Sequence, residues 1–317
     1  MSENLEISKN QSYCILGLLI GISLVLKAYT YLTSPPTDLL KSMYVLALLL
    51  GLIIIVLVYA LTKELTDNNI AALFASSLAM FIPLYSWKTV NFLNHTFAVI
   101  LLLLTFLALM YVKETRYWRT LTVIPLILSL VHVYSLIFLP IILLYFLLTK
   151  LEKKEVSKRE YIFAGVSAMF IIGIFIFLTS TPNLLIMTQE YVKVGYYSLA
   201  AENFSITKAF LIAGLLPVYL GAIGAYYAIP KKKKMALLMI SACGIFLAAM
   251  LFNVIPITIG FPYLGLMLAC FAGEVFVRFE KTILTSRIKE KLSSLTFALF
   301  VIIFVLNLLH FLKFIKY

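Results

Sequence analysis

Charged residues are scarce in this sequence: they make up 13% of the 317 residues, whereas 63% are hydrophobic. A water-soluble domain needs a polar surface that so few charges cannot supply, so the soluble globular classes are excluded. Cysteine is also rare, and Cys14, Cys243 and Cys270 all lie in apolar runs, where they indicate packing rather than a disulfide framework. The short motifs of P-loop proteins, zinc proteases and serine hydrolases do not occur.

What the sequence does contain is a series of apolar runs of about 20 residues, the length that crosses a bilayer as a helix. The runs lack the polar alternation of a membrane barrel, and a helix satisfies its own backbone hydrogen bonds in lipid. We therefore predict an all-α, polytopic membrane protein of about eleven spans. The predicted spans are 12–32, 41–62, 69–86, 92–112, 119–133, 134–149, 161–180, 207–228, 235–255, 257–277 and 294–313.

The basic residues set the expected orientation. Most of the 26 Lys and Arg residues fall in alternate loops, including the 150–160 cluster and the run Lys231–Lys234. The positive-inside rule then places the N-terminus in the cytoplasm and the C-terminus outside. The net charge of +12 thus belongs to membrane topology and does not indicate nucleic acid. The two basic clusters are either anionic-lipid sites or plain topology signals, and the cytoplasmic bias alone accounts for them.

We expect a single transmembrane domain over residues 1–317, with core spans in 1–180, an extracytoplasmic loop at 181–206 and C-terminal spans in 207–317. The loop is the longest on the outer side, and loops of this length often form lids or bind substrates. It could equally serve only to connect two spans.

The polar residues of the outer half are the candidate site. They are Asp38, Lys88, His95, His132, Tyr134 and Glu190. Polar groups near membrane depth are costly and often functional, although each has a structural alternative. Asp38 could cap the helix that starts at Leu39, His95 could be a solvated residue beside a capping Asn94, and His132 could be a structural histidine in a tight hairpin.

The stretch from Tyr44 to Tyr145 resembles the GT-C class of membrane glycosyltransferases, and most of all the transmembrane part of the oligosaccharyltransferase catalytic subunit. The segments that carry the resemblance are Val58–Leu65, Ala71–Ala75, the Pro83-Leu84-Tyr85 exit and a short hairpin closed by Leu139-Pro140, followed later by Pro256–Phe276. We expect no soluble C-terminal domain.

The resemblance implies an outward-facing site that binds a polyprenyl-phosphate sugar donor. Carried over by position, Asp38 matches the acid of the first outer loop, Lys88 a basic position, and Glu190 the acid of a mobile loop. It also implies a divalent metal such as Mg²⁺ or Mn²⁺, for which Asp38, His95 and Glu190 are the candidate ligands; a histidine suits a transition metal better than magnesium.

The leading hypothesis is a glycosyltransferase of the hexosyltransferase type that passes a sugar to an extracytoplasmic acceptor. In it, Asp38 and Glu190 are catalytic, and Lys88, His95, His132 and Tyr134 bind substrate. The expected partners are the bilayer, the donor lipid and other membrane subunits, and the expected location is the plasma membrane of a prokaryote.

Two alternatives stay open. Where the family carries a pair of acids, this chain has Asn94-His95-Thr96-Phe97, which motivates a non-catalytic subunit or scaffold. A lipid transporter or flippase is the other alternative, although the spans carry few of the mid-membrane charges and broken helices that transporters use.

Overall fold

A computed structural model describes residues 9–33, 38–80, 82, 92–131, 133–180, 214–252, 254–255, 257–284 and short pieces within 298–306. Within some helices it describes only the backbone: the side chains of 9, 25–33, 38–48, 92–95, 133–134, 178–179, 257–259 and 284 lie outside the described set. The described part is helical and contains no strand, which confirms the all-α class.

Where the structure describes the chain, its helices agree closely with the predicted spans; the predicted loop 181–206 and most of the last span, 294–313, lie outside the described residues. In the first part of the chain they are α1 (Lys9–Thr33), α2 (Asp38–Thr66), α3 (Asn69–Met80), α4 (Phe92–Tyr111), α5 (Trp118–Leu121), α6 (Val123–Val131), the 3-10 helix η1 (Val133–Ile137), α7 (Phe138–Leu151) and α8 (Lys158–Ser180). In the second part they are α11 (Leu215–Ala228), the 3-10 helix η2 (Ile229–Lys231), α12 (Lys234–Leu251) and α13 (Ile257–Leu284).

Four of the described helices are long and apolar enough to cross a membrane: α2, α8, α12 and α13. Shorter apolar helices accompany them, including the predicted hairpin, which forms as Trp118–Val131 followed by Ser135–Leu151. The chain is therefore an integral membrane protein. The figure of about eleven spans and the direction in which they cross remain predictions.

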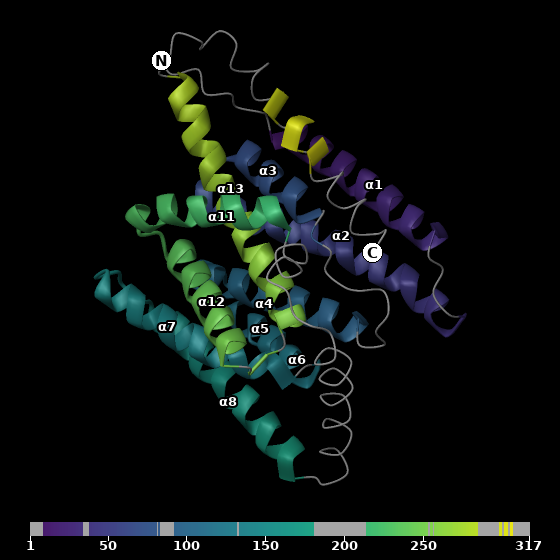
Figure 1. Cartoon of the computed structure of the whole chain (residues 1–317). Coiled ribbons are helices and arrows are strands. Elements are labelled where there is room, and N and C mark those ends of the chain that lie inside the picture. The colour runs from purple at the N-terminus through teal and green to yellow at the C-terminus, as the bar shows by residue number, and fades with distance from the viewer. Residues whose placement is uncertain are drawn as a thin grey trace.

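Helix α13 lies at the centre of the bundle (Figure 1). It packs against α2 and α3 on one side and against α11 and α12 on another. The ring of Phe276 lies 5.2 Å from that of Phe74 in α3, and Phe271 is fully buried. The peripheral helix α8 leaves the bundle near the bottom of the same view and exposes most of its length.

Glycine allows α11 to cross α13 at a short distance (Figure 1). A Cβ atom added at Gly221 would lie 2.3 Å from the backbone oxygen of Leu268, and one added at Gly224 would lie 1.9 Å from that of Phe271. No side chain fits in these gaps. Small residues at such crossings bring helix backbones into van der Waals contact, which drives helix association in lipid because lipid and protein interiors are equally apolar.

Helix α13 continues beyond the predicted end of its span at residue 277 and reaches Leu284. The prediction ended the span where charge begins, at Arg278. The helix itself does not end there because its charged residues find partners: Arg278 lies over the ring of Tyr227 at 5.5 Å, and Glu280 accepts a hydrogen bond from Asn68.

Candidate functional site

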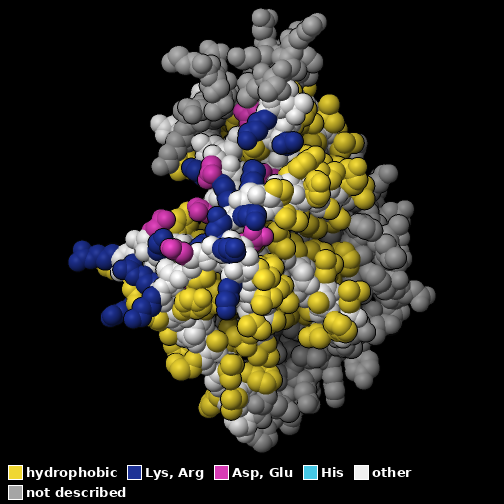
Figure 2. Space-filling model, turned by 90° about the vertical axis from the view of Figure 1, so that its left-hand side faces the viewer, with side chains coloured by type: hydrophobic (Ala, Val, Ile, Leu, Met, Phe, Trp, Pro, Cys, Tyr) yellow, Lys and Arg dark blue, Asp and Glu magenta, His cyan; other side chains and the backbone are white. Residues whose placement is uncertain are grey.

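The two ends of the helix bundle differ in the polar groups that they carry. Because successive helices run in opposite directions, the turns near residues 63–69, 111–118, 151–158 and 228–234 meet at one end, together with the last turns of α13. We call this the charged end. In Figure 2 charged side chains gather on one part of the visible face, beside a broad hydrophobic surface. The opposite end is where α2, α4, α7 and α13 begin.

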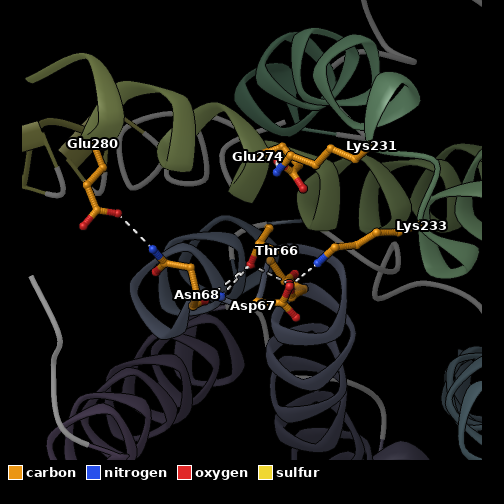
Figure 3. Close-up of polar contacts among 8 residues, drawn as sticks. Thr66, Asp67, Asn68, Lys231, Lys233, Glu274 and Glu280 are labelled. Carbon is orange, nitrogen blue, oxygen red and sulfur yellow. Dashed lines mark hydrogen bonds and ion pairs between the residues drawn. The ribbon is translucent and has the colours of Figure 1, made fainter. Parts of the chain in front are cut away.

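Four consecutive lysines in the turn between α11 and α12 organise the charged end. Lys231 pairs with Glu274 of α13, and Lys233 pairs with Asp67 in the turn between α2 and α3 (Figure 3). Lys232 pairs with Glu152 just after α7. Lys234 lies 2.8 Å from Glu160 in the first turn of α8. A single turn thus connects four separate parts of the bundle, so this run does more than mark topology.

Local sequence shapes the turn that receives Lys233. Asp67 has a φ of 56°, a left-handed conformation that Asp tolerates better than most residues. The side chain of Asn68 then caps α3, its Oδ1 accepting hydrogen bonds from the backbone N–H of Ile70 at 2.8 Å and of Ala71 at 3.0 Å. The Nδ2 of Asn68 donates to Glu280 at 2.9 Å. The turn therefore holds α2 and α3 against the end of α13 (Figure 3).

Glu160 is buried at the start of α8, and both of its carboxylate oxygens accept hydrogen bonds. Its Oε2 accepts a hydrogen bond from the backbone N–H of Ser157 at 2.5 Å, and the hydroxyl of Ser157 accepts one from the N–H of Glu160 at 3.2 Å. This reciprocal pair is a capping box. The Nζ of Lys234 completes the set by donating to both carboxylate oxygens of Glu160, at 2.8 and 2.9 Å.

Glu274 is equally buried but less well satisfied. Its Oε2 pairs with Lys231, whereas its Oε1 is buried without a hydrogen-bond partner. A buried ion pair gains stability only when its remaining polar atoms are also bonded, because desolvation of both charges is costly. The ion pairs of the charged end thus connect helices and turns to one another, and they do not form a reactive site. Among the side chains that the structure describes, no three His, Cys, Asp or Glu groups come together as a metal site would require.

Three of the residues predicted to carry the chemistry have their backbone towards the opposite end. Asp38 is the first residue of α2, His95 lies in the first turn of α4, and Tyr134 lies in η1. Their side chains are outside the described set, and Lys88, His132 and Glu190 lie outside the described residues altogether. The convergence of these six residues on one cavity, and their capacity to bind a metal, therefore remain predictions.

The backbone still separates Asp38 clearly from the ion pairs. Helix α2 has 29 residues from Asp38 to Thr66, and at 1.5 Å per residue this is about 42 Å of helix. Asp38 and Asp67 thus lie at opposite ends of the same helix. This makes Asp67, whose side chain is 79% exposed, a natural reference for experiments on Asp38.

Comparison with known proteins shows a similarity between helices α2 to α8 and one protein family. Residues 37–179 match the family described as dolichyl-phosphate-mannose-protein mannosyltransferase. The match begins one residue before α2 and ends one residue before the end of α8. It covers somewhat less than half of the chain and supports the GT-C resemblance. It does not extend to the closer likeness to oligosaccharyltransferases, which stays a prediction. No curated protein matches the sequence.

The partners of Lys231–Lys234 were not predicted from the sequence. A signal was present, because each neighbouring turn at this end offers an acid: Asp67, Glu152 and Glu160. Glu274 gave a second signal as an acid embedded in an apolar run, where an unpaired charge would be very costly. The pairing itself depends on which turns are adjacent in space, and hydropathy carries no such information.

Proposed function

We propose that this protein is a membrane glycosyltransferase that moves a sugar from a polyprenyl-phosphate donor to an extracytoplasmic acceptor. The observation that carries the proposal is the family match, which coincides with the helices α2 to α8. The matched family's description names a dolichyl-phosphate-mannose donor and a protein acceptor. A polyprenyl-phosphate mannose is therefore the first donor to test.

The proposed reaction is a displacement at the anomeric carbon of the sugar. The acceptor hydroxyl oxygen forms a bond to that carbon, the bond from the carbon to the phosphate oxygen breaks, and the polyprenyl phosphate leaves with the bonding electrons. Asp38, as general base, takes the proton of the acceptor hydroxyl. Lys88 and His132 stabilise the phosphate, Tyr134 and His95 contribute to substrate binding, and Glu190 closes the site. No step is assigned to a metal.

The position of Asp38 at the first residue of α2 suits this role. Here a carboxylate is close to the unpaired N–H groups and the positive end of the helix dipole, which favour its ionised, proton-accepting form. Asp38 also begins α2 at the end of that helix opposite the ion pairs, and the predicted orientation makes this the extracytoplasmic end. The same features would serve a simple helix cap, so only activity separates the two roles.

The test is sugar transfer by the purified full chain in proteoliposomes. Radiolabelled polyprenyl-phosphate mannose is supplied with extracytoplasmic proteins and lipids as acceptors. We expect Asp38→Asn to lower the transfer rate by about a hundredfold or more, the contribution typical of a general base. The matched control Asp67→Asn removes an aspartate from the other end of α2 and should retain transfer.

Equal transfer by Asp38→Asn and the parent would eliminate Asp38 as the base. Absence of transfer by the parent, together with a stoichiometric membrane partner that restores it, would favour the non-catalytic subunit. Movement of the lipid between leaflets without sugar transfer would instead favour the flippase. The domain division, the oligomeric partners and the prokaryotic plasma membrane location are parts of the same proposal.

A further inference from the structure

The turns that follow α4 and α7 form a second basic surface at the charged end, beside the lysine run. Residues 113–119 and 150–159 together contain eight Lys or Arg residues and three Glu residues. The two turns lie side by side, because Nη1 of Arg159 donates a hydrogen bond to the backbone oxygen of Lys113 at 2.9 Å. Lys113, Arg116, Lys153, Lys154 and Lys158 are all exposed. We call this surface the basic patch.

The ion pairs of the lysine run leave the basic patch strongly cationic. Glu152 and the neighbouring Glu160 could have neutralised the patch, but they pair with Lys232 and Lys234 instead. The acids that remain in the two turns are Glu114 and Glu155, both exposed. The lysines of the turn between α11 and α12 thereby neutralise two carboxylates that would otherwise reduce the positive charge of the basic patch. An exposed surface with this excess of positive charge attracts anions.

The apolar residues beside the patch indicate where the anion resides. Leu147 and Leu151 of α7 are 55% and 68% exposed, and Tyr161 of α8 is 54% exposed. In an integral membrane protein such exposed apolar side chains contact lipid chains. The patch also includes Tyr117, 71% exposed, next to Trp118. Tyr and Trp prefer the depth of lipid headgroups. A soluble anion would make no contact with these apolar side chains, whereas the acyl chains of a lipid would.

We propose that the basic patch binds the headgroup of an anionic phospholipid, whose acyl chains lie along the exposed faces of α7 and α8. The occupant is a lipid of the leaflet at the charged end, which the orientation predicted from the basic residues makes the cytoplasmic leaflet. That leaflet carries negative surface charge, and basic residues close to it add to binding in proportion to their number. The proposal does not depend on glycosyl transfer.

Trp118 provides a direct probe of lipid occupancy. The sequence contains two tryptophans, so Trp87→Phe leaves Trp118 as the only one. The full chain is reconstituted in phosphatidylcholine bilayers, and chain-labelled doxyl phosphatidylglycerol or doxyl phosphatidylcholine is added as quencher. Quenching gives the ratio of binding constants for the anionic and the zwitterionic lipid. We expect a ratio of about ten in this background, falling as salt is raised.

Two double variants with equal charge changes test the location of the site. Lys154→Gln with Lys158→Gln should bring the ratio to within about twofold of one. The control, Arg278→Gln with Lys281→Gln, removes two charges from the end of α13 and should leave the ratio near that of the Trp87→Phe parent. Melting temperatures in the same bilayers confirm that each variant is folded.

Three results would overturn the proposal. The first is a ratio close to one in the parent, and the second is an equal fall in both double variants. The third is loss of the lipid preference when inorganic phosphate replaces sodium chloride at the same ionic strength, which would identify the patch as a site for a free anion. None of these results bears on sugar transfer, so they leave the proposed function untouched.

Discussion

Helices α8 and α13 are both long enough to cross a membrane, yet they occupy opposite environments. Of the span Gly260–Ile283 in α13, 89% is buried inside the protein, compared with 28% of Lys158–Phe177 in α8. The more buried helix is the less apolar of the two. In a water-soluble protein the more apolar helix would be the more buried one. In a bilayer the lipid chains are as apolar as any side chain, so central positions go to helices that offer small and polar groups for packing and hydrogen bonding.

The same comparison shows that a helix outside the family-matched segment helps to form the core of that segment. Helix α8 lies within residues 37–179 except for its last residue, whereas α13 lies outside them. Nevertheless α13 packs against α2 and α3, both within the matched segment. Gly273 of α13 lies so close to α2 that an added Cβ would be 2.5 Å from Cγ2 of Thr62. Residues 37–179 should therefore fold poorly without the C-terminal helices.

The largest expected effect comes from filling the crossing of α11 and α13. Gly224→Val would place its side chain against the backbone oxygen of Phe271, which cannot move without displacing α13. We expect a loss of at least about 3 kcal/mol in the free energy of unfolding, the upper range for overpacking. Unfolding of the purified chain by SDS in mixed micelles measures this loss.

Gly173→Val in α8 is the matched control for that substitution. A Cβ added at Gly173 has nothing within 4 Å, so the new side chain meets lipid and its effect should stay within about 0.5 kcal/mol. If Gly173→Val were as damaging as Gly224→Val, α8 would not be the lipid-exposed helix, and the contrast between the two helices would fail.

A smaller effect on stability is expected from a substitution that creates a cavity in the core than from one that overfills it. Met267 of α13 is fully buried, whereas Met169 of α8 is 64% exposed. Met267→Ala should lower the free energy of unfolding by about 3 kcal/mol, because the cavity loses packing contacts. Met169→Ala only exchanges one lipid contact for another and should change it by less than about 0.5 kcal/mol. Similar losses in the two variants would show that α13 is no more central than α8.

Much of this architecture could be predicted from the sequence, and the reasons are local. Apolar runs locate helices because lipid forces each span to satisfy its own hydrogen bonds. The predicted span 92–112 corresponds to Phe92–Tyr111 and the predicted span 161–180 to Lys158–Ser180. The end of α13 was predicted too early because charged residues end an apolar run without ending a helix when they have partners, as Glu280 has in Asn68.

The arrangement of the helices and the candidate site could not be predicted in the same way. Hydropathy ranks α8 above α13 and so gives no hint that α13 is central. The spacing of Gly221 and Gly224 was a usable sign of a close crossing, but it does not name the opposing helix. The candidate residues Asp38, Lys88 and Glu190 lie far apart in the sequence, and their distances in space depend on how the segments between them fold. Sequence patterns with periods of a few residues cannot encode such long-range geometry.

The smallest predicted effect concerns two of the buried carboxylates, Glu274 of α13 and Glu160 of α8, and here the sign of the stability change matters more than its size. Glu274 of α13 has an unpaired buried oxygen, so replacement of its ion pair by apolar groups, in Lys231→Met with Glu274→Met, removes a desolvation cost. We expect no loss of stability or a gain of about 1 kcal/mol. Lys234→Met with Glu160→Met instead removes the capping box of α8, in which both carboxylate oxygens are bonded. This variant should lose about 1 kcal/mol.

SDS unfolding of the two double variants gives both values. A loss in the first variant that equals the loss in the second would mean that the charge of Glu274 is as well satisfied as that of Glu160. The central helix would then gain from its charge as the peripheral helix does, and the contrast between them would rest on packing alone.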